Sequence, residues 1–358
     1  MRWSTTIGRF AGIDVKVHAT FLLLLAWVAI SHWRSEQSAH AIGAGLVFIL
    51  ALFFCVVLHE FGHALTARRY GVKTRDIILL PIGGVARLER IPDKPRQELW
   101  IALAGPAVNV AIALVLAVWL QIASAWQPVE ELTVTGGSFI ERLLVVNVFL
   151  VVFNLIPAFP MDGGRVLRAL LGLKLEYVKA TQIAASVGQV FAFGLGFLGL
   201  FANPFLVFIA LFVWIGAAQE ASMVQMKSAL GGIPVRQLMI TDFRTLASSD
   251  TLGHAVDLTL TTSQKDFPVV DEDRVMGILM QKDLLQALDG SGRGRLVREA
   301  MKTTFETADD SEMMEPVFRR LQACSCHTLP VLRAGRLAGL VTMDNVGEFV
   351  SIRAALKK

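Results

Sequence analysis

Charged residues are scarce in this sequence. Asp, Glu, Lys and Arg make up 18% of the 358 residues, whereas hydrophobic residues make up 54%. An ordinary soluble domain carries about 25% charge. The low charge, together with a mean hydropathy of +0.55, indicates a chain that lies largely in a lipid bilayer.

Cysteine is also scarce, since only Cys55, Cys324 and Cys326 are present. Three cysteines are too few for a disulfide framework, and they fit a soluble part in the reducing cytoplasm. The net charge of +4 raises the question of nucleic acid. However, the basic residues gather in loops between apolar runs, as they do in membrane proteins. We therefore expect no nucleic-acid partner.

No small-residue cleavage site follows the first apolar run, which ends at Trp33, so this run is expected to be a retained anchor and not a signal peptide. A membrane span needs about 20 apolar residues. The turn signal Asn203-Pro204 divides the last run into two. The sequence therefore predicts an α-helical membrane domain with six transmembrane helices, from uncharged runs at residues 19–33, 41–58, 99–127, 143–161 and 180–219.

Lys and Arg are concentrated in two of the loops between these runs, at residues 68–96 and 165–179. Cytoplasmic loops carry the excess of Lys and Arg in membrane proteins. We therefore expect a multi-pass protein of the cell (inner or plasma) membrane with both termini in the cytoplasm. The apolar segment 77–86 is too short and too broken by Pro and Gly to span. Two interpretations stay open for it, a hairpin that dips into the membrane and a surface loop.

From Ile233 onward the chain repeats itself at an offset of 62 residues, measured from Met239 to Met301. Each copy reads as a helix, two short strands around a polar turn, and a closing helix. The sequence thus predicts a membrane domain over residues 1–226 and a soluble α/β tandem module over residues 227–358, with units at about 233–290 and 295–352. Neither unit is large enough to bury much core alone, so the two should pack together.

His59, Glu60 and His63 lie at the end of the second predicted span. Four residues make about 400° of helical rotation, so both imidazoles point to one side, as two ligands of one zinc ion need. Glu60 is then within reach of a metal-bound water. The alternative is a structural pair of histidines, but ionisable groups at membrane depth cost about 2.5 to 3.5 kcal/mol each and persist mainly for function.

A hydrolytic zinc keeps three protein ligands and one open position, so a third ligand is expected. Asp162 is the best candidate. Pro157 and Pro160 break the helix just before it, and Gly163 and Gly164 allow a tight backbone after it. The alternative for Asp162 is an ordinary Asp-Gly turn at a membrane boundary.

The motif from His59 to His63, combined with the segment 154–163 (NLIPAFPMDG), resembles the site-2 protease family of intramembrane zinc metalloproteases. Residues 105–109 (GPAVN) resemble a further motif of that family, and the repeated units are similar to a tandem pair of CBS domains. The resemblance implies one Zn²⁺ per chain, bound by His59, His63 and Asp162, with Glu60 as general base. It implies a metalloendopeptidase of regulated intramembrane proteolysis.

The expected substrate is a single-span membrane protein. Because a transmembrane helix hides its carbonyl groups, it must unwind before attack, and strand addition to an edge supplied by residues 77–86 is one means. The resemblance implies that Asn154 and Asn109 help to hold the substrate strand. For each asparagine, hydrogen bonding between helices is the alternative.

In the CBS family, a Thr near the end of the second strand and an Asp three residues later often contact adenine nucleotides. The first unit has Met280 and Asp283, and the second has Thr342 and Asn345, so each unit keeps one of the two. The resemblance implies an adenine nucleotide at Asp283 and Thr342 and a homodimer through the CBS modules. The alternative is a pair that serves only as a dimerisation platform.

Several other residues are expected to be structural. Cys55 lies one turn before His59, but a fourth protein ligand would close the zinc to water, so Cys55 is predicted to be a packing residue. His18 is expected at the membrane interface. Cys324, Cys326 and His327 align in the repeat with Thr262, Gln264 and Lys265, which have no ligand character.

A different class of protein, channels and transporters, also joins membrane spans to paired CBS modules. A transporter should line its pathway with polar residues on several spans. In this sequence the strong ionisable groups concentrate at one helix end and one broken helix. An inactive binding protein derived from a protease is disfavoured because the base and the three presumed ligands are all present.

Overall fold

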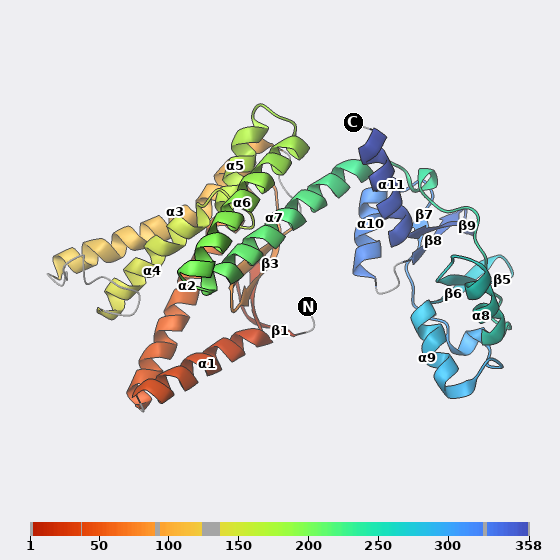
Figure 1. The fold of residues 1–358 in the computed structure, drawn as a ribbon, viewed down its shortest axis with the longest axis horizontal. Helices are drawn as coiled ribbons and strands as arrows, with labels where there is room; N and C mark the ends of the chain where they lie inside the picture. Colours follow the sequence, from red (N-terminus) through yellow and green to blue (C-terminus); the bar gives the residue numbers. More distant parts are fainter. Residues whose placement is uncertain (1–2, 37, 90–93, 124–136, 325–327, 357–358) are drawn as a thin grey trace. The chain divides into compact units, whose positions relative to one another are not determined.

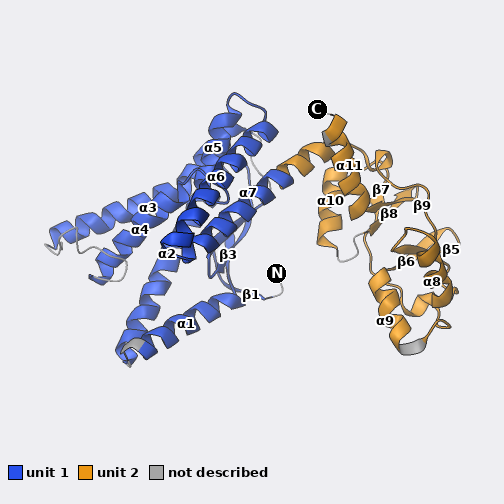
Figure 2. Cartoon of the chain, in the orientation of Figure 1, with its two compact units in different colours: residues 1–222 blue, residues 223–358 orange. Residues whose placement is uncertain are grey.

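The computed structural model describes residues 3–36, 38–89, 94–123, 137–324 and 328–356. The chain divides into two compact units, Met1–Ser222 and Met223–Lys358 (Figure 2). The division falls inside one continuous helix, α7 (Phe205–Leu230), four residues before the predicted boundary after residue 226. α7 therefore contributes its first part to unit 1 and its last part to unit 2.

Unit 1 consists of helices and a small sheet, and α1 and α2 pack against the strands of that sheet (Figure 1). α3 packs against α2, α4 and α5 and so lies at the centre of the helices that carry the predicted site. The helices of this unit are α1 (Ala19–Glu36), α2 (Ala39–Arg69), α3 (Pro95–Ile122), α4 (Phe139–Asn154), α5 (Asp162–Gly172), α6 (Tyr177–Phe201) and the first part of α7.

Helices lie at all six predicted spans, but only α2, α3, α6 and α7 are long and apolar enough to cross a membrane, among the residues that the structure describes. The apolar part of α1 is shorter, and α4 has 16 residues. At about 1.5 Å per residue, 16 residues rise about 24 Å against a hydrocarbon core of about 30 Å. The six-span prediction is therefore not confirmed. For α4 the reason is that the apolar run 143–161 is not one helix, since α4 ends at Asn154.

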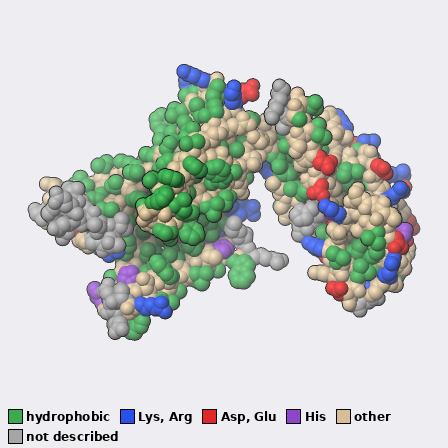
Figure 3. Space-filling view, viewed as in Figure 1, with side chains coloured by type: hydrophobic (Ala, Val, Ile, Leu, Met, Phe, Trp, Pro, Cys, Tyr) green, Lys and Arg blue, Asp and Glu red, His purple; other side chains and the backbone are tan. Residues whose placement is uncertain are grey.

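The surface of unit 1 agrees with a membrane environment. Figure 3 shows hydrophobic side chains gathered over its helices, whereas acidic and basic side chains are scattered over unit 2. Trp27, Trp119 and Phe193, on three different helices, are 66%, 59% and 71% exposed. Exposed apolar area of this extent is expected where lipid replaces water.

The sheet of unit 1 contains β1 (Ser4–Phe10), β2 (Ile13–His18), β3 (Thr74–Leu80) and β4 (Gly83–Leu88), in that order. β2 and β3 are parallel, and the other two pairs are antiparallel. The segment 77–86 therefore lies in a β-hairpin, which can either dip into the membrane or lie at the surface of the protein. Its depth in the membrane stays a prediction. β4 is an edge strand of this sheet.

Unit 2 contains two α/β modules, as the repeat predicts. α8 and α10 start 62 residues apart, at Leu252 and Met314, and so do α9 and α11, at Gln281 and Met343. The first module has η2 (Val235–Gln237), α8 (Leu252–Thr261), β5 (Phe267–Asp271), β6 (Arg274–Leu279) and α9 (Gln281–Ser291). The second has η3 (Val297–Glu299), β7 (Ala308–Asp309), α10 (Met314–Ala323), β8 (Thr328–Arg333), β9 (Arg336–Thr342) and α11 (Met343–Leu356).

The segment that precedes each module in the sequence packs against the other module. The Val235 N–H donates to the Glu312 carbonyl at 2.8 Å, and Lys302 forms a backbone bridge with Ile278. Val235 is buried in the core of the second module, and Val297 is buried in that of the first. The two modules are thus interdependent, which confirms the expectation that they pack together.

Candidate metal centre

His59, Glu60 and His63 are all carried by α2. The helix is unbroken from Ala39 to Arg69, so the two histidines lie one turn apart. Both are buried, with exposed fractions of 6% and 4%, and their Nε2 atoms are 3.1 Å apart.

Asp162 is the first residue of α5. Its Oδ2 lies 3.1 Å from His59 Nε2 and 3.0 Å from His63 Nε2. Ligands at about 2.0–2.1 Å from a tetrahedral zinc ion are about 3.4 Å from one another. The three atoms therefore converge at nearly the spacing that one zinc ion needs, and the donor set of two imidazoles and one carboxylate fits that metal.

The other nitrogen of each imidazole is held by an oxygen. His59 Nδ1 lies 2.5 Å from Asn109 Oδ1, and His63 Nδ1 lies 2.6 Å from the Ile101 carbonyl oxygen. An amide or carbonyl oxygen can only accept, so each Nδ1 carries the proton and donates. Each Nε2 is then left with its lone pair toward Asp162, which is the tautomer that a metal ligand requires.

Asn109 is part of a chain of hydrogen bonds behind His59. It is fully buried, and its Nδ2 donates to Asn147 Oδ1 at 2.8 Å. Asn147 Nδ2 donates to the Leu143 carbonyl at 2.8 Å and lies 3.5 Å from Cys55 Sγ. The contacts of Asn109 are thus those of a residue that orients His59, and its role toward substrate stays a prediction.

Asn147 is absent from the site residues that the sequence predicts. A signal for it exists, because Asn147 and Asn154 are seven residues apart in an otherwise apolar run and so share one face of α4. Asn154, the last residue of α4, donates from Nδ2 to the Leu150 carbonyl at 2.9 Å. Its role toward substrate stays a prediction.

Two glycines allow the close packing around the ligands. A Cβ atom at Gly105 in α3 would lie 2.2 Å from His63 Nε2 and 2.7 Å from His59 Nε2. A Cβ at Gly163 would lie 2.2 Å from the Ile156 carbonyl oxygen. Any larger residue would push α3 or α5 away from the cluster.

Glu60 faces the hairpin β3–β4. Its Oε2 accepts a hydrogen bond from the Ala86 N–H at 3.2 Å. A Cβ at Gly84 would lie 2.8 Å from Glu60 Cγ, so the edge strand β4 runs directly beside this carboxylate.

Asp76 ties this hairpin to the rest of the sheet. Its side chain is fully buried. Oδ1 accepts from Arg87 Nε at 2.5 Å and Oδ2 accepts from Lys16 Nζ at 2.8 Å, so one carboxylate joins β2, β3 and β4. Hydrogen bonds from Arg87, with a further one from Lys16, lower the pKa of Asp76 to about 2.

We expect Asp76→Asn to destabilise the protein by about 2 kcal/mol at pH 7. The folded pKa lies below the ordinary value of 3.8, so this stabilisation is present above about pH 4 and is lost as the pH falls toward 2. Thermal unfolding in detergent at several pH values measures the effect. Asp14→Asn is the matched control, because the Asp14 side chain is 40% exposed and its Oδ1 lies 3.6 Å from Arg9 Nε. Equal losses of stability in the two variants at pH 7 would contradict the prediction.

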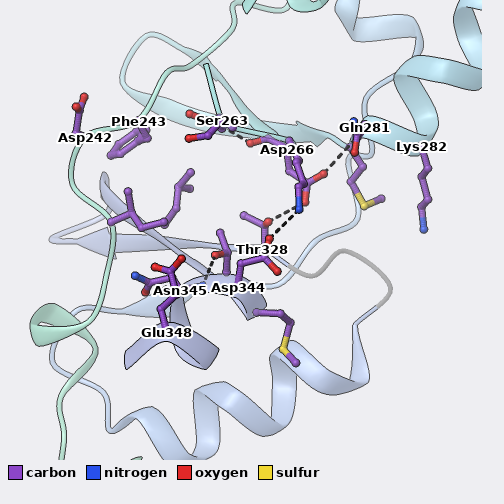
Figure 4. Close-up of a pocket in the computed structure, with 17 residues that line it drawn as sticks. Asp242, Phe243, Ser263, Asp266, Gln281, Lys282, Thr328, Asp344, Asn345 and Glu348 are labelled. Atoms are coloured by element: carbon purple, nitrogen blue, oxygen red, sulfur yellow. Dashed lines mark hydrogen bonds and ion pairs between the residues drawn. The ribbon is translucent and has the colours of Figure 1, made fainter. Parts of the chain in front are cut away.

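Unit 2 contains a cavity of about 880 Å³ lined by both modules (Figure 4). Asp266 lies in its wall, where Oδ1 accepts from the Gln281 N–H at 3.2 Å and Oδ2 accepts from Thr328 Oγ1 at 2.7 Å. Asp266 and Thr328 occupy equivalent positions of the repeat. The charged residues of the wall are Asp242, Asp266, Asp344, Glu348, Lys265 and Lys282.

Of the two predicted nucleotide-binding residues, Thr342 lies in the wall of this cavity and Asp283 does not. Asp283 Oδ2 lies 3.8 Å from Lys302 Nζ, and the Asp283 side chain is 14% exposed. Thr342 Oγ1 accepts from the Asn345 N–H at 3.1 Å. Cys326 and His327 lie outside the described residues.

These features define a class of protein. Unit 1 contains apolar helices long enough to span a membrane, and two of its helices bring together two imidazoles and a carboxylate with a glutamate beside them. A paired α/β module follows. The ligand set, with Glu60 next to it, is that of a hydrolytic metal site.

Comparison with known proteins identifies the class further. The model of peptidase family M50 matches residues 47–139 and 123–195, and the CBS domain model matches residues 235–290. Zinc metalloprotease MJ0392 of Methanocaldococcus jannaschii is 32% identical over 353 residues, which cover 98% of this chain and 97% of that protein. Putative zinc metalloprotease sll0528 of Synechocystis is 30% identical over 303 residues, which cover 78% and 76%.

Among solved structures, the site-2 protease from Methanocaldococcus jannaschii is 40% identical and covers 61% of this chain and 95% of its own, with a TM-score of 0.46. The chain belongs to peptidase family M50, the site-2 protease family. It is a zinc metalloprotease with a CBS domain pair. The enzyme interpretation therefore holds over the transporter alternative.

Proposed function

We propose that this metalloprotease cleaves transmembrane segments of single-span membrane proteins inside the bilayer, with His59, His63 and Asp162 as zinc ligands and Glu60 as general base. The observation that carries the proposal is the buried convergence of His59 Nε2, His63 Nε2 and Asp162 Oδ2 within 3.0–3.1 Å. Regulated intramembrane proteolysis is the process that such cleavage serves.

The roles of the residues follow from their positions. A zinc ion, when bound, supplies a Lewis acid and a bound water with a pKa near 7. Asn109 and the Ile101 carbonyl hold the two imidazoles in the ligating tautomer. Glu60, held at Oε2 by the Ala86 N–H, would take the proton of the attacking water and return it to the leaving amine.

The edge strand β4 supports a means of presenting the substrate. A transmembrane helix has every backbone group paired, so attack requires an unwound segment. An unwound segment can add to β4 as a further strand, because β4 is paired only with β3 among the strands that the structure describes. Ala86 of this strand contacts Glu60, so an added strand would pass close to the base. Asn154 would then pair with freed backbone groups of the substrate.

Cleavage by reconstituted protein tests the proposal. In vesicles that contain a single-span model substrate, we expect a cut within the apolar segment. Removal of zinc with a chelator should abolish it, and added Zn²⁺ should restore it. Full cleavage after complete zinc removal, or cuts confined to the exposed flanks, would contradict the proposal. Mass spectrometry of the fragments locates the cut.

We further propose that residues 1–226 form the membrane domain of a cell-membrane protein whose termini and CBS module (residues 227–358) are cytoplasmic. The basic residues of segments 68–96 and 165–179 support this orientation. Reporter fusions should be cytoplasmic at Lys174 and non-cytoplasmic at Asn203. The reverse result would overturn the topology.

The CBS pair is proposed to bind an adenine nucleotide in the cavity of unit 2 and to form a homodimer. Coupling between two sites typically amounts to about 1–3 kcal/mol, so AMP, ADP or ATP should change the cleavage rate severalfold. Thr342→Val should weaken the response, whereas Asp283→Asn, outside the cavity wall, is the matched control. Calorimetry that detects no binding of any adenine nucleotide would reduce the pair to a dimerisation platform, and sedimentation measures the dimer.

A further inference from the structure

Arg168 in α5 is a charged side chain buried in the helices of unit 1, with an exposed fraction of 1%. A guanidinium is costly to bury unless charged partners surround it. Arg168 Nε and Nη2 donate to Glu98 Oε1 at 2.8 and 2.5 Å, and Nη1 donates to Glu220 Oε1 at 2.5 Å. One side chain of α5 is thus fastened to α3 by Glu98 and to α7 by Glu220.

Aromatic rings complete the surroundings of this guanidinium. Arg168 Cζ lies 5.0 Å from the ring centroids of Phe159 and Tyr177, a distance at which cation–π attraction operates. Tyr177 begins α6. Phe159 is buried in the turn that leads from α4 to Asp162. The Arg168 cluster (Arg168, Glu98, Glu220, Phe159 and Tyr177) therefore holds both α5 and the turn before it.

The cluster is connected to the metal ligands by short stretches of backbone. Asp162 and Arg168 belong to the same 11-residue helix, so a shift of α5 moves the Asp162 carboxylate. On α3, Glu98 lies one turn before Ile101, whose carbonyl accepts from His63 Nδ1. The Arg168–Glu98 pair therefore fixes the position of α5, which carries Asp162, relative to the part of α3 that orients His63.

We propose that Arg168 is a positioning residue that raises zinc affinity by holding Asp162 against His59 and His63, with Glu98 and Glu220 as its anchors. This inference rests on the proposed zinc centre. Glu220 lies two residues before the end of unit 1, on the helix that continues into unit 2. Its ion pair with Arg168 fastens that helix to α5.

The test is the zinc affinity of full-length protein in detergent, measured by competition with a chromophoric chelator, together with the absorption spectrum of the Co²⁺-loaded protein. Arg168→Met should weaken zinc binding about 10–100-fold, the range for groups that orient a metal ligand, and should alter the Co²⁺ spectrum. Arg168→Lys and Glu220→Gln each keep part of the hydrogen-bond network, so the zinc affinity of each should fall severalfold. Asp76→Asn, which breaks a buried ion pair away from α5, should lose stability and keep its zinc affinity.

A double variant separates positioning from stability. Arg168→Met/Glu98→Met removes the fully buried pair as a unit, a change that is often neutral for folding. It leaves the Glu220 carboxylate, whose side chain is 24% exposed and so reaches solvent. If Arg168 only stabilises the fold, this variant should regain both wild-type stability and wild-type zinc affinity. We expect it to regain the first and not the second.

The outcomes distinguish this inference from the proposed zinc centre. If the wild type holds no zinc, or Asp162→Ala binds zinc as the wild type does, the proposed centre is wrong. If those two behave as expected but Arg168→Lys, Glu220→Gln and the double variant all bind zinc with wild-type affinity and spectrum, the positioning role is wrong. The milder variants keep this test available even if Arg168→Met does not fold.

Discussion

Glu60→Gln is expected to keep a full complement of zinc and to slow cleavage by about 10²–10⁴-fold, the usual contribution of a general base. The amide has nearly the shape of the carboxylate and leaves His59, His63 and Asp162 unchanged. It cannot take a proton from water at neutral pH. The turnover of a single-span substrate in vesicles, with zinc content measured on the same sample, reports the two effects separately.

Glu89→Gln is the matched control for this substitution. Glu89 follows β4 and is exposed, so the same change of charge on the same hairpin should leave turnover within about twofold. A turnover of Glu60→Gln close to that of Glu89→Gln would remove Glu60 from the mechanism. Loss of zinc in Glu60→Gln would instead place this carboxylate among the ligands.

The parts of the molecule that sequence predicts well are those that depend on local spacing. His59 and His63 share a face because α2 is regular, and the two modules follow from a repeat without gaps. Asp162 could be predicted as the third ligand because prolines mark the break in the helix before it. The hairpin β1–β2 is not among the predictions, although residues that alternate in polarity flank its turn, where Ala11 and Gly12 adopt φ values of 50° and 82°.

The parts that sequence does not predict depend on contacts between distant segments. Asn109 meets Asn147 across 38 positions, and Arg168 meets Glu98 across 70. No periodicity links such residues. The six-span prediction is not confirmed for a related reason, because an uncharged run does not show where its helix ends. In the repeat, Asp283 aligns with Asn345 and Thr342 with Met280, and only the packing of the modules decides that Thr342 lines the cavity and Asp283 does not.

Substitution of any one of the three zinc ligands is also expected to have a large effect. His59→Ala, His63→Ala and Asp162→Ala should each lose zinc on dialysis against a moderate chelator and show no cleavage, because two remaining ligands do not retain the metal. Each of these variants should lose more zinc affinity than Asn109→Ala, for which a loss of about 10–100-fold is expected. Asn109→Ala leaves the ligands in place and removes only the group that orients His59.

The controls for these variants come from the same unit. His18→Ala removes an imidazole that hydrogen-bonds Thr20 at 2.8 Å and should keep zinc and activity. Asp162→Asn keeps an oxygen at the same place without the charge, so its affinity should lie between those of Asp162→Ala and the wild type. Zinc content is measured by atomic absorption after gel filtration. Full occupancy in Asp162→Ala would mean that another group is the third ligand, and full occupancy in His59→Ala would remove His59 from the ligand set.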